Sequence, residues 1–63
     1  MKVKLAEFRE ALGVSQDDIA NLLGVSRSYY EKVEQGNRNP SYNFIKKFVE
    51  QYPQSNIRQI FFS

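Results

Sequence analysis

The side chains best equipped to hydrogen-bond a ligand lie in one short run of the chain. The run holds a guanidinium, a hydroxyl, a phenol, a carboxylate and an ammonium group, on Arg27, Ser28, Tyr29, Glu31 and Lys32. A guanidinium can donate two hydrogen bonds to guanine O6 and N7, a hydroxyl can donate or accept, and a carboxylate can accept from cytosine N4. A phenol can place its ring against a thymine methyl or its hydroxyl on a phosphate. These groups therefore suit the edges of base pairs, although each would also be an ordinary solvated side chain on a protein surface.

A helix over about 26–35 is needed to turn this run outward, and the sequence predicts one. Ser26 is a good N-cap for it. Tyr30 and Val33 then follow at the spacing that buries one helical stripe and leaves the polar side chains outside.

A second helix is predicted immediately before it, over about 16–23. Its apolar residues are expected on one side of the helix: Ile19, Ala20, Leu22 and Leu23. Gly24 then breaks the pattern where a left-handed backbone angle would turn the chain. Ser15 and Asp18 resemble a capping box, and Asp17 and Asp18 suit the positive end of the helix dipole. Because carboxylates repel phosphates, we expect both to point away from a bound nucleic acid or to lie too far from it to matter.

The two-helix pattern resembles the phage repressor and Cro-type helix-turn-helix family, often called Xre. The matching residues are Ser15-Gln16, Ile19-Ala20, Leu23-Gly24-Val25-Ser26-Arg27-Ser28, Val33-Glu34, Gly36 and Asn39-Pro40-Ser41. The agreement continues upstream to Arg9 and downstream over 57–61, and agreement of this length gives few false matches. The resemblance implies an all-α, compact five-helix domain of the lambda-repressor type over residues 1–63, in which the second and third helices form the helix-turn-helix.

The resemblance also implies roles for residues outside the run 27–32. In the family an Arg at the place of Arg9 pairs with a Glu late in the reading helix, here Glu34. Gln16 matches a residue that contacts a DNA phosphate, and Ser26 is expected to contact the DNA backbone as well. The turn-forming stretch after the reading helix resembles a loop that clamps the backbone through side chains and N–H groups, here Asn37, Arg38 and Asn39.

Two further residues are expected to be structural, Ala20 and Gly24, and Tyr30 is a departure from the family. Ala20 lies where the two helices should cross, and a larger side chain there would cost a few kcal/mol through overpacking. Gly24 has a backbone role. Tyr30 departs from the family, which usually has a smaller aliphatic residue at this place, and a buried phenol needs a partner or an opening to solvent. Either the core is rearranged around Tyr30, or the helix is rotated so that Tyr29 and Tyr30 share the exposed edge.

The remaining helices are predicted from apolar spacing. One should run through about residue 12 and end at Gly13, with Val3, Leu5, Phe8 and Leu12 on one side. Another should run over about 41–51, with a core stripe made of Phe44, Ile45, Phe48 and Val49. Lys46 and Lys47 on that helix are read as a solvated face, with flanking phosphate contacts as the alternative.

The last segment is unusually apolar. Ser55-Asn56 is expected to cap a short final helix whose exposed apolar residues would form a dimer interface, as the family commonly does in this region: Ile60, Phe61 and Phe62. The alternative is that Phe61 or Phe62 folds back into the core, with one of the two in each role.

Composition excludes several classes of protein. The 63 residues have no Cys and no His, which removes disulfides, the usual zinc ligand sets and Cys or His catalysis. The net charge of +2 is too small for a polycation that coats nucleic acid, so binding must depend on where the cations lie. No apolar run approaches the roughly 20 residues that cross a bilayer. We expect a cytoplasmic protein without metal, cofactor, small-molecule substrate or enzymatic activity.

Two functions fit these observations. The first is a sequence-specific transcriptional regulator that binds a near-palindromic double-stranded DNA operator as a homodimer. The resemblance implies two reading helices about 34 Å apart in successive major grooves. The second is an antitoxin-like or adaptor module for protein interaction, in which the hydrophobic C-terminal segment matters most.

Overall fold

This computed structural model describes residues 4–62, except for the side chain of Phe62. Within this range the chain forms five α-helices joined by short turns and loops. They are α1 (Leu5–Leu12), α2 (Gln16–Leu23), α3 (Arg27–Glu34), α4 (Tyr42–Gln51) and α5 (Ile57–Phe62). No strand occurs among these residues, so the expected all-α architecture of five helices is confirmed. The expected helix at the N-terminus included Val3, which lies outside the described residues.

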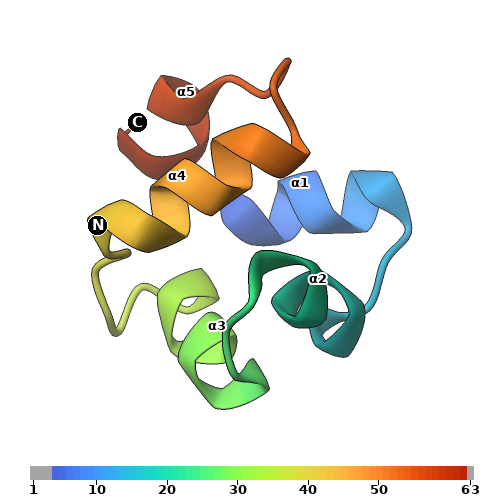
Figure 1. Ribbon diagram of the computed structural model, residues 1–63, viewed down its shortest axis with the longest axis vertical. Coiled ribbons are helices and arrows are strands. Elements are labelled where there is room, and N and C mark those ends of the chain that lie inside the picture. Colours follow the sequence, from blue (N-terminus) through green and yellow to red (C-terminus); the bar gives the residue numbers. More distant parts are fainter. Residues whose placement is uncertain (1–3, 63) are drawn as a thin grey trace.

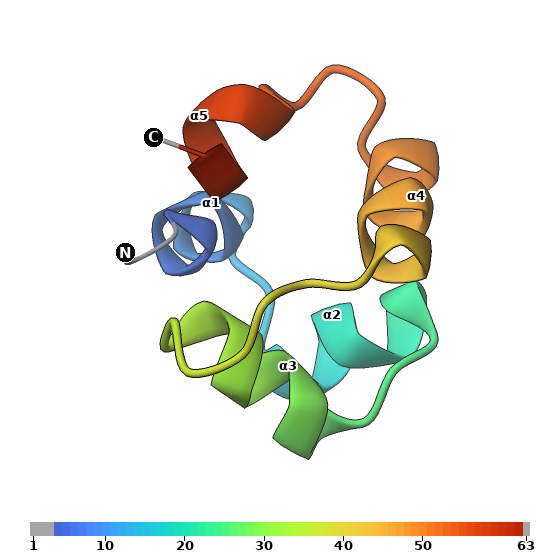
Figure 2. The ribbon, with the colours of Figure 1, turned by 90° about the vertical axis from the view of Figure 1, so that its left-hand side faces the viewer.

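The helices are arranged in two groups around α4. Figure 1 shows α2 and α3 together below α4, and α5 on its opposite side. The turned view in Figure 2 places α1 beside α5, and these two helices are in contact. The domain is nearly equal in its three dimensions, 25 × 24 × 22 Å. Within the described residues, no helix combines the length and the apolar character that crossing a membrane requires.

Local capping signals explain where the helices begin and end. Three serines, Ser15, Ser26 and Ser41, precede α2, α3 and α4, and each hydroxyl accepts a 3.1 Å hydrogen bond from the backbone N–H three residues further on. Gly13 and Gly24 follow α1 and α2 in the left-handed conformation, with φ of 75° and 71°. These local bonds satisfy backbone groups that the helix itself leaves unpaired, and they set bounds within one or two residues of those predicted.

The core is built from all five helices. Its buried residues are Leu5, Ile19, Ala20, Leu23, Tyr30, Val33, Phe44, Phe48, Ile60 and Phe61. Three residues that were expected in the core are exposed instead. Leu12, Leu22 and Val49 are 43%, 49% and 39% exposed. At about 100° per residue, Leu22 lies roughly 200° around α2 from the buried Ala20, so one face of the helix cannot cover both.

The C-terminal helix corrects the expected dimer surface. Ile60 and Phe61 are only 6% exposed, so they are core residues of the protomer rather than an exposed apolar patch. The Phe61 ring meets Phe44 and Phe48 edge-on, with centroids 6.2 and 5.2 Å apart, because α5 folds back over the core. The side chain of Phe62 lies outside the described residues. The alternative that Phe61 returns to the core is therefore the one found.

Candidate nucleic-acid interface

A tight turn holds α3 against α2. Residues 24–26 connect the two helices. Gly24 turns the chain in the left-handed conformation, and the Val25 N–H donates to the Ala20 carbonyl over 3.0 Å. Ala20 itself is 2% exposed, and α2 and α3 are in contact. Figure 2 shows the resulting pair of crossed helices at one end of the molecule. This is a helix-turn-helix arrangement.

The buried stripe of α3 decides which side chains face solvent. Tyr30 and Val33 are 0% exposed. Arg27, Ser28 and Lys32 consequently lie on the exposed side of the helix. The core accommodates Tyr30, so the alternative in which the helix rotates and Tyr30 shares the exposed edge does not occur.

The Tyr30 hydroxyl is an unusual feature of this core. It is buried and makes no hydrogen bond of regular geometry with the described residues. Burial, followed by the nearby Glu34 carboxylate, raises the pKa of Tyr30, so the phenol stays neutral at physiological pH. A small aliphatic side chain at this place would leave no such polar group in the core.

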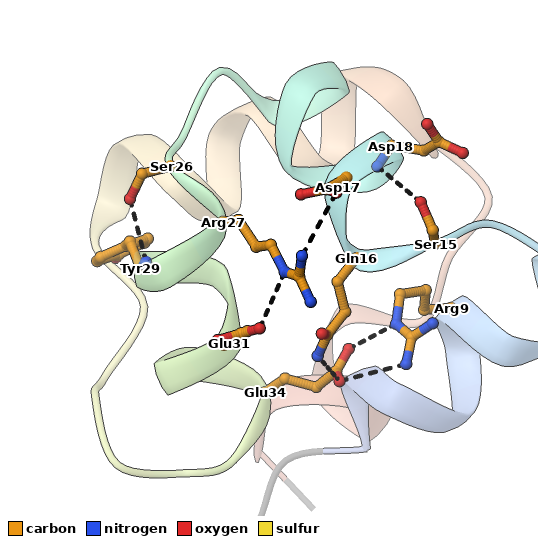
Figure 3. A network of polar contacts seen from close by, with 10 residues as sticks. All are labelled: Arg9, Ser15, Gln16, Asp17, Asp18, Ser26, Arg27, Tyr29, Glu31 and Glu34. Atoms are coloured by element: carbon orange, nitrogen blue, oxygen red, sulfur yellow. Dashed lines mark hydrogen bonds and ion pairs between the residues drawn. The ribbon is translucent and has the colours of Figure 1, made fainter.

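The end of α3 is tied to α1 and α2 by a polar network (Figure 3). Arg9 Nε donates to Glu34 Oε2 over 2.8 Å, and its Nη1 donates to the Val14 carbonyl over 3.0 Å. Gln16 Nε2 donates to Glu34 Oε1 over 2.9 Å. The pair between Arg9 and Glu34 implied by the resemblance is therefore present. Because an amide has two N–H groups, Gln16 keeps one donor for a further contact.

The network shifts the pKa of its carboxyl group. Burial alone would raise the pKa of Glu34, but Arg9, followed by the nearby Tyr30 hydroxyl and the Gln16 amide, outweighs burial and holds that pKa below its usual value. The same bond to Glu34 raises the pKa of Arg9. Both groups are thus charged at neutral pH, and α3 is held on α1 and α2 by a charged, largely buried contact.

Arg27 lies on the exposed face but is already engaged. Its Nε donates to Glu31 Oε2 over 3.0 Å, and its Nη1 lies 3.5 Å from Asp17 Oδ2 (Figure 3). The Arg27 side chain remains 56% exposed. Asp17 thus lies beside Arg27, because the first turn of α2 is close enough to α3 for this contact. That Asp17 points away from DNA or lies too far from it to matter stays a prediction. Ser28 and Lys32 are exposed beside Arg27.

Tyr29 has a different environment from the one expected of a base-reading residue. Its ring packs on Phe44 with centroids 5.7 Å apart, and its hydroxyl accepts a hydrogen bond from the Ser41 N–H over 3.0 Å. The Arg38 guanidinium lies 5.3 Å from the ring centroid, within the range of a cation–π contact. Tyr29 thus connects α3 to the following loop and to α4. No local signal in the sequence indicates this contact.

An open pocket of about 480 Å³ separates α3 from the loop and α4. Its lining includes Ser26, Arg38, Asn39, Ser41 and Lys47. Two helices begin here, at Ser26 and Ser41, and their N-termini carry partial positive charge that adds to the two cationic side chains. Asn37, Arg38 and Asn39 are all exposed. The edge of α3 is therefore electropositive, which suits an anionic ligand.

Lys47 is exposed on α4, and its ammonium group also reaches the turn after α2. Its Nζ lies so close to Gly24 that a Cβ there would be 2.7 Å away. The side chain thus returns from α4 to the turn between α2 and α3, and it is not simply part of a solvated helix face. Because Lys47 and Gly24 are far apart in the sequence, no local pattern predicts that they lie close together.

Comparisons with known proteins agree with this geometry. The model of the helix-turn-helix domain family matches residues 3–54. An uncharacterized HTH-type transcriptional regulator from Archaeoglobus fulgidus is 42% identical over 45 residues, which make up 71% of this chain and 20% of that protein. The chain thus spans about one fifth of the length of this relative. No solved structure matched this chain.

Proposed function

The chain belongs to the helix-turn-helix domain family, and we propose that it is a sequence-specific DNA-binding transcriptional regulator of the phage repressor and Cro type. The exposed face of α3 enters the major groove, where base edges differ between the four base pairs. The observation that carries the proposal is the complete burial of Tyr30 and Val33. It leaves Ser28 exposed on the opposite side of α3 and Arg27 exposed at the flank of the buried stripe.

The base-reading group in this proposal is Arg27, Ser28 and Lys32, and Glu31 lies among them with its carboxylate bonded to Arg27. Arg27 and Ser28 lie in the first turn of α3, the part of a recognition helix that approaches the bases. Tyr29 helps to hold α3 in place, because its ring packs on Phe44 and its hydroxyl accepts a hydrogen bond from the Ser41 N–H.

Phosphate contacts flank the base-reading group. Arg38, with the amides of Asn37 and Asn39, extends from the exposed loop that follows α3. Gln16 and Ser26 supply polar groups at the starts of α2 and α3. Charged contacts to phosphate give affinity that falls with rising salt, whereas base contacts give the sequence preference.

A homodimer on a near-palindromic operator is part of the proposal. One α3 offers too few side chains for a long recognition sequence, whereas two related by a two-fold axis read two half-sites. Ile60 and Phe61 are buried within the protomer, so the interface has to involve other residues. The same burial weakens the alternative of an antitoxin-like or adaptor module, because that function depended on an exposed C-terminal apolar surface.

Selection of bound sequences from a pool of randomised duplexes tests the proposal. The expected result is enrichment of one motif with two inverted half-sites about one helical turn apart. The control is a protein in which Arg27 and Ser28 are both replaced by Ala, which should lose the motif while it keeps its circular dichroism spectrum. A pool that remains random at low salt would overturn the proposal.

A further inference from the structure

The Arg27 guanidinium is held from two helices by carboxylates. Glu31, one turn further along α3, accepts from Nε over 3.0 Å. Asp17, in the first turn of α2, lies 3.5 Å from Nη1. Figure 3 shows the three side chains converging between the helices. We call them the Arg27 clamp.

The clamp is not primarily a stabilising device. The side chains of Arg27 and Asp17 are 56% and 63% exposed, and exposed ion pairs contribute little to folding because water and salt screen them. Its effect falls instead on Arg27 itself. A long side chain that would otherwise sample many rotamers is restrained before any ligand arrives.

The charge of the clamp distinguishes between two kinds of acceptor. Arg27 has one positive charge, whereas Asp17 and Glu31 carry two negative charges between them. A phosphate that approaches the guanidinium is therefore repelled by two nearby carboxylates. The O6 and N7 atoms of guanine are neutral acceptors, and they meet much less of this repulsion.

The remaining donors fit the same acceptor. A guanidinium has five N–H groups, of which Glu31 engages the one on Nε and Asp17 lies beside one on Nη1. The other N–H groups belong to the terminal nitrogens, which can form a two-pronged contact with O6 and N7 of guanine.

We propose that Asp17 and Glu31 are specificity-determining positioning residues, which hold Arg27 for a guanine edge and disfavour its contact with DNA phosphates. This inference rests on the proposed DNA-binding function. It assigns Asp17, a residue of α2, a part in reading bases through α3.

The test uses Asp17→Asn and Glu31→Gln, with Asp18→Asn as the matched control. Asp18 adjoins Asp17 in the first turn of α2 and loses the same charge in the control, but it is not part of the clamp. Each protein is titrated with the selected operator, with an operator whose Arg27-dependent guanine is replaced by adenine, and with an unrelated duplex. Circular dichroism checks that all variants are folded.

The preference for guanine over adenine should fall about 2- to 10-fold in Asp17→Asn and Glu31→Gln, the range expected from releasing one restrained side chain. Both should also bind the unrelated duplex more tightly than the parent protein. Asp18→Asn should leave the guanine preference unchanged. If all three variants keep the parent preference, the inference is overturned.

A measurement without DNA separates this inference from the proposed function. Nuclear magnetic resonance relaxation of the Arg27 Nε–H group should show a restrained side chain in the parent protein and in Asp18→Asn. The group should become mobile in Glu31→Gln, and less strongly so in Asp17→Asn. An Arg27 as mobile in the parent as in these variants contradicts the clamp even if the protein binds DNA. A restrained Arg27 in a protein that enriches no duplex contradicts the proposed function, and the specificity role falls with it.

Discussion

Arg9 Nε and Glu34 Oε2 lie 2.8 Å apart and join the first helix to the end of the third. The side chains are 16% and 8% exposed, so each charge depends on the other for the contacts that water would otherwise provide. This pair, with the amide of Gln16, fixes the C-terminal end of α3, whereas Arg27 lies at the N-terminal end. The orientation of the base-reading face thus depends on a contact made by residues far away in the sequence.

Replacing Arg9 with Ala should lower the free energy of unfolding by about 3 kcal/mol, because it leaves the Glu34 carboxylate buried with its charge uncompensated. Urea denaturation measures the change. Arg58→Ala, at an exposed arginine of α5, is the control and should change stability by less than about 0.5 kcal/mol. Equal stabilities of the two variants would contradict the role of the ion pair.

The Glu34 carboxyl should make stability depend on pH. Its pKa in the folded protein lies below the ordinary value of 4.5, so the unfolded chain takes up a proton more readily. The resulting stabilisation is complete above that ordinary value, and it is lost as the pH falls through the folded pKa. Denaturation of the parent and of Glu34→Gln, repeated on both sides of pH 4.5, should show a steeper acid loss in the parent. Parallel pH profiles would refute this assignment.

Removal of the Tyr30 hydroxyl should be harmless or favourable. Tyr30→Phe keeps the ring in its buried position and removes a polar group that has no regular hydrogen bond among the described residues. Stability should stay the same or rise by up to about 1 kcal/mol. Thermal unfolding checks this, and a clear loss would mean that the hydroxyl forms a strong bond in solution. Tyr30→Ala is the contrasting variant and should cost about 3 kcal/mol or more through the cavity it leaves.

The local signals of the sequence predicted the elements better than their contacts. Serine caps and the glycines after α1 and α2 act within one turn, so the helix bounds followed from neighbouring residues. The contact of Tyr29 with Ser41 and that of Asp17 with Arg27 depend on how helices cross, which no local pattern specifies. Likewise, the apolar residues of α5 suit either a core or a dimer surface, and only the path of the chain shows that Phe61 turns inward.

The Tyr29 hydroxyl should contribute to the loop that follows α3. Tyr29→Phe removes the 3.0 Å bond to the Ser41 N–H and should lower stability by about 1 kcal/mol. Tyr42→Phe is the control, since that side chain is 79% exposed, and it should have almost no effect. Chemical denaturation compares the two. Indistinguishable losses would show that the bond to Ser41 is not important for the fold.

The central claim is that Arg27 reads sequence, whereas Arg38 provides general attraction to DNA. Binding of Arg27→Ala and Arg38→Ala to the selected operator and to an unrelated duplex, at several salt concentrations, tests it most directly. Arg38→Ala should weaken both complexes alike and reduce the salt slope by about 1. Arg27→Ala should lose about 1 to 3 kcal/mol of the operator preference. If Arg27→Ala instead preserves the full difference in affinity between operator and unrelated DNA, α3 does not read bases through Arg27 and the account is wrong.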